Sequence, residues 1–152
     1  MTEEPKTPSQ ATIAREVSRN KNKAEDYLKD PEKSKKLLDQ AIKKANSKEE
    51  NKGPLADVWN SLKALVRMFQ AYIHKEYTVV PWGSIVLVVV AILYFVSPID
   101  LIFDWLPLAG FVDDAAVIGF VIKAIQNDLN AFLKWENLNK SINEVLDQES
   151  SI

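Results

Sequence analysis

Apolar residues recur at helical spacing through the first half of the chain. A weak amphipathic pattern covers Ser9–Leu28. A second begins at Asp30, a suitable N-cap, with Pro31 at the first helical position. A stronger pattern covers Leu55–Tyr77, and its apolar residues are spaced three and four apart: Trp59, Leu62, Val66, Phe69 and Ile73. The spacing predicts three helices, the third packing on its neighbours or lying on a membrane surface.

The longest uncharged run covers 23 residues, Tyr77–Ile99. As a helix it would be about 34 Å long, enough to cross a hydrocarbon core of about 30 Å. Trp82 and Tyr94 lie near its two ends, where amphipathic rings prefer the membrane interface. We therefore expect a transmembrane helix from Val79 to Val96. A buried core helix of a soluble bundle is the alternative.

The run ends at Ser97, because Pro98 disfavours helical geometry in the residue before it. We expect a short helical segment at Pro98–Leu106 and a last helix from Val112 to about Asn137. Only about two turns of that last helix are apolar on all sides, so it would have to pack against the first span rather than insert alone. The polar tail after Lys140 is expected to fray.

Charge is divided unevenly along the 152 residues, although the net charge is only −2. Residues 1–75 carry a net charge of +5 and residues 76–152 a net charge of −7. No lysine or arginine lies between Lys75 and Lys123. Because basic residues favour the cytoplasmic side, we expect a cytoplasmic N-terminus and two membrane segments. A single span is the alternative, and it would expose an apolar helix to water.

These expectations combine into an all-α fold, a membrane-embedded helical hairpin with a polar helical N-terminal extension. The predicted parts are a charged extension and linker (1–53), an amphipathic helix (54–77), the membrane hairpin domain (78–137) and a polar tail (138–152). The N-terminus is acidic and has no apolar core, so no secretory signal is expected.

The chain offers few groups for catalysis or transition-metal binding. It has no cysteine and one histidine, which argues against thiolate sites, histidine-rich metal sites and catalytic triads. Four aspartates lie within fifteen residues, between apolar segments: Asp100, Asp104, Asp113 and Asp114. Carboxylates bind hard cations, and they also cap helix N-termini. A structural role is the first interpretation, and a cation or proton site is the alternative.

The segment SPIDLIFDWLPLAGFVDD resembles the signature of the YkvA-like family, small helical membrane proteins defined by a domain of unknown function. The matching signature positions are Ser97, Pro98, Asp100, Asp104, Pro107, Gly110, Asp113 and Asp114. The sequence departs from the pattern at Phe103, where the family usually has proline, and at Leu106. The resemblance implies a membrane hairpin and no established activity.

We therefore expect a non-enzymatic protein that acts as a membrane-anchored interaction or scaffold protein. Its expected partners are the lipid bilayer and either a second copy of the chain or another membrane protein. No cofactor is expected, and no nucleic acid, because acidic residues interleave with the lysines of residues 21–52. The alternatives are a cation- or proton-linked membrane component that uses the four aspartates, and a soluble helical interaction protein.

Overall fold

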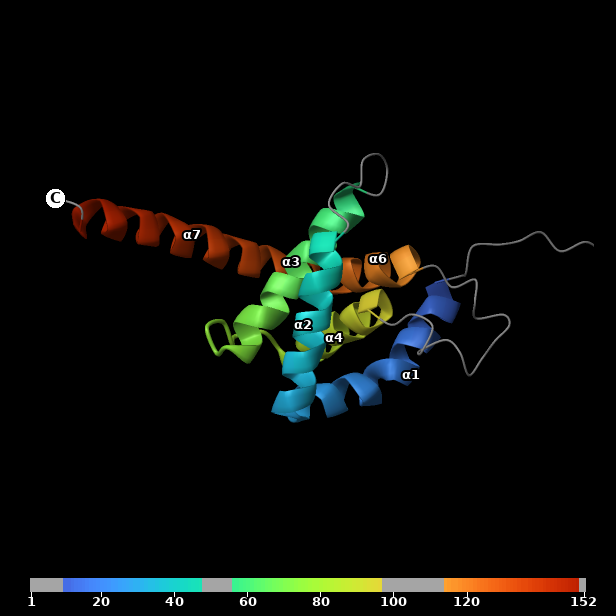
Figure 1. The fold of residues 1–152 in the computed structure, drawn as a ribbon. Coiled ribbons are helices and arrows are strands. Elements are labelled where there is room, and N and C mark those ends of the chain that lie inside the picture. Colours follow the sequence, from blue (N-terminus) through green and yellow to red (C-terminus); the bar gives the residue numbers. More distant parts are fainter. Residues whose placement is uncertain (1–9, 48–55, 97–113, 151–152) are drawn as a thin grey trace, which may run out of the picture.

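A computed structural model describes residues 10–47, 56–96 and 114–150. Within these ranges the chain forms α-helices and no strands, so the predicted all-α class is confirmed there (Figure 1). The helices are α1 (Gln10–Lys29), α2 (Pro31–Ser47), α3 (Ala56–Ile73), α4 (Trp82–Val96), α6 (Asp114–Ala124) and α7 (Gln126–Ser150).

The turn between α1 and α2 forms as predicted. The carboxylate of Asp30 accepts hydrogen bonds from the backbone N–H groups of Glu32, at 3.0 Å, and Lys33, at 3.3 Å. These bonds satisfy two of the N–H groups that a helix leaves free at its start. Pro31 occupies the first helical position, where its missing N–H costs nothing.

The end of α3 is set by a backbone motif that the apolar pattern does not reveal. The N–H of Glu76 bonds to the carbonyl of Ala71 at 2.8 Å, and the N–H of Lys75 bonds to that of Tyr72 at 3.1 Å. This pair of bonds is a Schellman motif. Lys75 takes the left-handed conformation that the motif requires, with φ at 59°. The helix therefore ends at Ile73, earlier than the predicted Tyr77.

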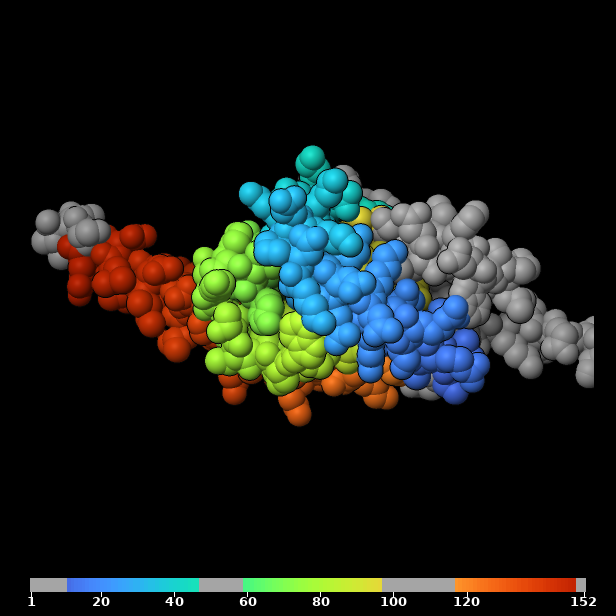
Figure 2. Space-filling model, turned by 90° about the horizontal axis from the view of Figure 1, so that it is seen from below, coloured from blue at the N-terminus to red at the C-terminus, as the bar shows by residue number. Residues whose placement is uncertain are grey.

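The apolar helix α4 lies at the centre of the bundle and contacts α1, α2, α3 and α6 (Figure 1). From Ile85 to Phe95 its side chains are buried, apart from the half-buried Leu87. Figure 2 shows one face of the molecule, on which α1 and α2 hide most of α4. The large apolar surface of α4 is therefore covered by helices of the same chain.

The helix α4 is shorter than the predicted segment Val79–Val96. The carbonyl of Pro81 accepts bonds from the N–H groups of Ser84 and Ile85, both at 3.0 Å, so the helix begins just after Pro81. Val79 lies in the preceding loop and is 75% exposed. Among the residues with described coordinates, no helix has the length and hydropathy needed to cross a membrane.

The C-terminal region is more helical than predicted. The turn residue Ile125 separates α6 from α7, yet its N–H still bonds to Val121 and its carbonyl still accepts from Leu129, both at 2.9 Å. Helical bonding thus runs through the junction. The prediction of an end near Asn137 and a frayed tail is wrong, because α7 continues to Ser150. Its outer half leaves the bundle and ends far from it (Figure 1).

An aromatic cluster fixes the base of α7 to the loop between α3 and α4. The ring centroid of Tyr77 lies 5.2 Å from that of Phe132 and 4.9 Å from that of Trp135, and Phe132 and Trp135 stack at 5.7 Å. Such ring pairs stabilise beyond the area they bury. Burial, and then the nearby Asp128 carboxylate, raises the pKa of the Tyr77 hydroxyl.

The left-handed conformation of Lys75 predicts an unusual response to glycine. Lys75→Gly removes the steric cost of a side chain at positive φ, so we expect the free energy of unfolding to rise by about 0.5–1 kcal/mol. Lys75→Val, with a β-branched side chain, is expected to lower it by about 1 kcal/mol. Urea unfolding measures both changes. A glycine variant less stable than the original chain would contradict the assigned motif.

The raised pKa of Tyr77 predicts an alkaline loss of stability. The folded protein keeps the Tyr77 proton at pH values where the unfolded chain, with a tyrosine pKa of about 10, has lost it. This contribution is complete below about pH 10 and is lost as the pH rises through the folded-state pKa. The urea midpoint of the original chain should fall between pH 9 and pH 11. In Tyr77→Phe, which has no hydroxyl to titrate at this position, the midpoint should fall less between these two pH values. Tyr72→Phe serves as the control, and an equal decline in all three proteins would count against the coupling.

Candidate interaction site

The predicted site residues lie almost entirely outside the described ranges. This holds for the signature residues from Ser97 to Asp113, including three of the four aspartates. Asp114 is the first residue of α6. This is the position at which the positive end of the helix dipole favours a carboxylate, as predicted from the sequence. The described residues contain no group of three or more acidic or histidine side chains that could hold a metal ion. The cation site stays a prediction.

The C-terminal end of α4, which leads into the signature segment, is held by side chains from three helices. The Lys44 ammonium donates to the carbonyl of Phe95 at 2.7 Å and lies 5.3 Å from the centroid of its ring. A cation at this place satisfies a free helix carbonyl and the negative end of the dipole. Trp59 meets Phe95 edge to face at 5.6 Å, and Asn20 donates to the Tyr94 hydroxyl at 3.2 Å.

The N-terminal end of α4 is also held by polar contacts. The indole N–H of Trp82 donates to the carboxylate of Glu25 in α1 at 3.0 Å. The hydroxyl of Ser84 donates to the carboxylate of Asp128 in α7. Both ends of the apolar helix are thus fixed to polar side chains of the surrounding helices. These contacts set the position of α4 within the bundle.

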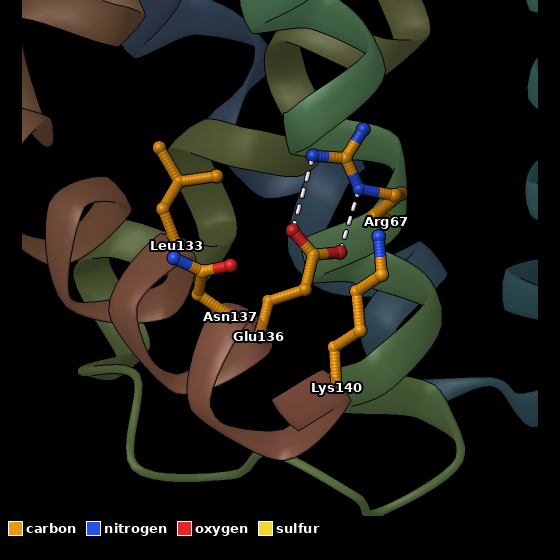
Figure 3. A pocket seen from close by; sticks show the side chains of 5 residues that line it. All are labelled: Arg67, Leu133, Glu136, Asn137 and Lys140. Atoms are coloured by element: carbon orange, nitrogen blue, oxygen red, sulfur yellow. Dashed lines mark hydrogen bonds and ion pairs between the residues drawn. The ribbon is translucent and has the colours of Figure 1, made fainter. Parts of the chain in front are cut away.

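A polar cleft of about 580 Å³ lies between α3 and residues 133–140 of α7 (Figure 3). The Arg67 guanidinium forms two bonds with the Glu136 carboxylate, at 2.7 and 3.1 Å, which is the paired geometry that arginine favours. The Lys140 side chain extends toward the same cleft. The cleft therefore suits a polar or anionic contact, and no nucleophile is paired with a base among its lining residues: Arg67, Leu133, Glu136, Asn137 and Lys140.

A second cleft, of about 370 Å³, lies between α2 and α3 and shares Arg67 with the first. Lys63 supplies another positive charge, while Ile42 and Val66 supply apolar surface. Both clefts are open to solvent, whereas sites for small molecules enclose most of the ligand surface.

The outer half of α7, residues 137–150, which we call the arm, carries an apolar stripe. Leu138, Ile142, Val145 and Leu146 are spaced four, three and one apart, which places them on one helical face. They are 62%, 49%, 54% and 55% exposed. Within the described part of the chain, these are four of the seven exposed large apolar side chains. Such a concentration on one face is typical of an interaction surface.

This stripe was not predicted from the sequence, because polar residues dominate the segment. The signal was present in the spacing, because intervals of three and four continue along one series: Phe132, Trp135, Leu138, Ile142 and Val145. The inner members of this series pack in the aromatic cluster, whereas the outer members are exposed. One continuous helical face thus belongs to the core at its base and to the surface along the arm.

Comparison with known proteins places one segment of the chain in a family. Residues 84–120 match the family described as "Protein of unknown function (DUF1232)". The chain is 42% identical over 52 residues to the uncharacterized membrane protein YkvA of Bacillus subtilis (strain 168). That alignment covers 34% of this chain and 49% of the relative, so the chain spans about half the length of the curated protein it matches.

No solved structure gives a significant match to the chain. The family segment covers the helix α4 from Ser84, the predicted signature and the first residues of α6. The predicted resemblance is therefore confirmed: residues 84–120 carry the domain of unknown function of the YkvA-like family.

Proposed function

We propose that this protein is a non-enzymatic interaction protein that works at a membrane, with the helical bundle as its base and the arm of α7 as its contact for a helical protein partner. The observation that carries the interaction role is the exposed stripe of the arm, which contrasts with the enclosure of α4. A folded chain that buries one apolar helix and exposes another apolar face has a surface left for a partner.

Three observations support the membrane part of the proposal. The family segment, residues 84–120, covers α4 from Ser84, and the relative that is 42% identical over 52 residues is named as a membrane protein. The helix α4 also contains no charged residue in its 15 positions. The basic surfaces of α2 and α3, with Lys63 and Arg67 beside the second cleft, fit an anionic headgroup layer.

The inserted hairpin with a cytoplasmic N-terminus is the second candidate, and the gap in basic residues between Lys75 and Lys123 favours it. In this form α4 would exchange its protein neighbours for lipid. The described helix is about 22 Å long, shorter than a hydrocarbon core of about 30 Å, so insertion would also require the helix to lengthen. The two candidates therefore differ in what covers α4.

Membrane fractionation tests the proposal. We expect the full chain to sediment with membranes and to be released by a high-salt or alkaline carbonate wash. Retention after both washes would instead favour the inserted hairpin. Recovery in the soluble fraction without detergent would contradict any membrane role.

Cysteine labelling separates the two candidates further, because the natural chain has no cysteine and gives no background. Single cysteines at Lys48, Leu108 and Asn143 would be treated with an impermeant maleimide in intact cells. For a peripheral bundle we expect no labelling at any position until the cells are opened. For the hairpin, Leu108→Cys alone should label in intact cells, and this result would replace the peripheral arrangement.

A further inference from the structure

The arm of α7 is an exposed amphipathic helix whose base is already fixed. The Arg67–Glu136 pair and the aromatic cluster around Trp135 hold α7 against the bundle. Beyond this point, the stripe of Leu138, Ile142, Val145 and Leu146 has no cover from the bundle. Because the arm is helical and oriented before any partner arrives, little ordering is needed for it to bind.

We propose that the stripe binds the same stripe of a second copy of this chain, with the two arms antiparallel. This inference rests on the interaction role proposed above and names its partner. A two-fold axis near Ile142 brings Leu138 close to the partner's Val145 and the partner's Leu146. The contact is closed and symmetric, as most homodimer contacts are. The spacing of four and three is also that of a two-helix seam.

The charges beside the stripe favour the antiparallel arrangement. Lys134 and Glu149 lie on the same side of α7 as the stripe, fifteen positions or about 22 Å apart. Both are exposed. In an antiparallel pair, Lys134 lies beside the partner's Glu149 at each end of the contact. In a parallel pair, Glu149 would face the partner's Glu149, which is repulsive.

The charge of α7 also favours a protein partner over a lipid surface. From residue 134 onward, α7 carries two lysines and four acidic residues. Helices that lie on anionic bilayers carry lysine and arginine on the polar face instead. The polar face of the arm is therefore unsuited to the headgroup layer, while its acidic end complements the basic end of a second copy.

Sedimentation equilibrium of the full chain tests the dimer, in buffer or in the detergent used for its extraction. We expect a concentration-dependent monomer–dimer equilibrium. Ile142→Asp places a charge at the centre of the stripe and should raise the dissociation constant about tenfold or more. Asn143→Asp adds the same charge one position away, off the stripe, and should change it by less than about twofold. Both positions are exposed in the monomer, so neither change disturbs the core.

A charge exchange tests the direction of pairing. Glu149→Lys should raise the dissociation constant about fivefold, because each end of the contact then holds two lysines. Adding Lys134→Glu restores opposite charges at both ends and should return the constant to within about twofold of the original. In a parallel dimer the second change would give no rescue. Position 134 would face position 134 of the partner, and position 149 would face position 149, so each facing pair would still carry like charges.

A chain that stays monomeric at all concentrations, or a dimer equally insensitive to Ile142→Asp and Asn143→Asp, would overturn the proposal. Loss of vesicle binding by Ile142→Asp without any change in self-association would assign the stripe to lipid and also overturn it. The membrane role is scored separately by fractionation. A monomer that still sediments with membranes refutes the dimer alone, and a dimer found only in the soluble fraction refutes the membrane role alone.

Discussion

The burial of α4 is the constraint on which the rest of the structure depends. Its 15 residues carry no charge, and most of them are removed from contact with solvent by the surrounding helices. Burying one large apolar side chain contributes about 1.5–3 kcal/mol, so covering this helix supplies much of the driving force that folds a small chain. The polar helices α1 and α2 supply part of that cover, with Val17, Ala24 and Leu38 facing inward. Most of their lysines remain exposed to solvent.

This burial also explains how the two differently charged halves of the chain fit together. The sequence suggests two environments for one molecule, a basic front and an acidic back. In the structure, parts of the two halves meet: Arg67 pairs with Glu136, and Lys44 satisfies the carbonyl of Phe95 at the end of α4. Some of the charge asymmetry is therefore used in contacts that close the bundle, while Lys63 remains at an open cleft.

Local signals in the sequence predicted local structure well. Asp30 and Pro31 marked a helix start because capping depends on adjacent residues, and the seam from Trp59 to Ile73 marked a buried face because its period is regular. The surroundings of α4 could not be predicted in the same way. An uncharged, apolar helix is removed from water equally well by lipid and by other parts of the protein. The arm was missed because four apolar residues among many polar ones carry little weight until Ile142 and Val145 are seen on one helical face. The signature aspartates from Asp100 to Asp113 lie outside the described residues, so their role remains the sequence prediction.

Amide hydrogen exchange in the membrane-associated chain tests most directly what covers α4. If α1 and α2 provide the cover, the amides from Val17 to Ala24 in α1 and from Leu37 to Ala45 in α2 should be protected together with those of α4. Exchange should then begin at Val79 and along the arm, where side chains are exposed. Rapid exchange through α1 and α2 while α4 stays protected would contradict the account, because the apolar helix would then be covered by lipid instead of by its own chain.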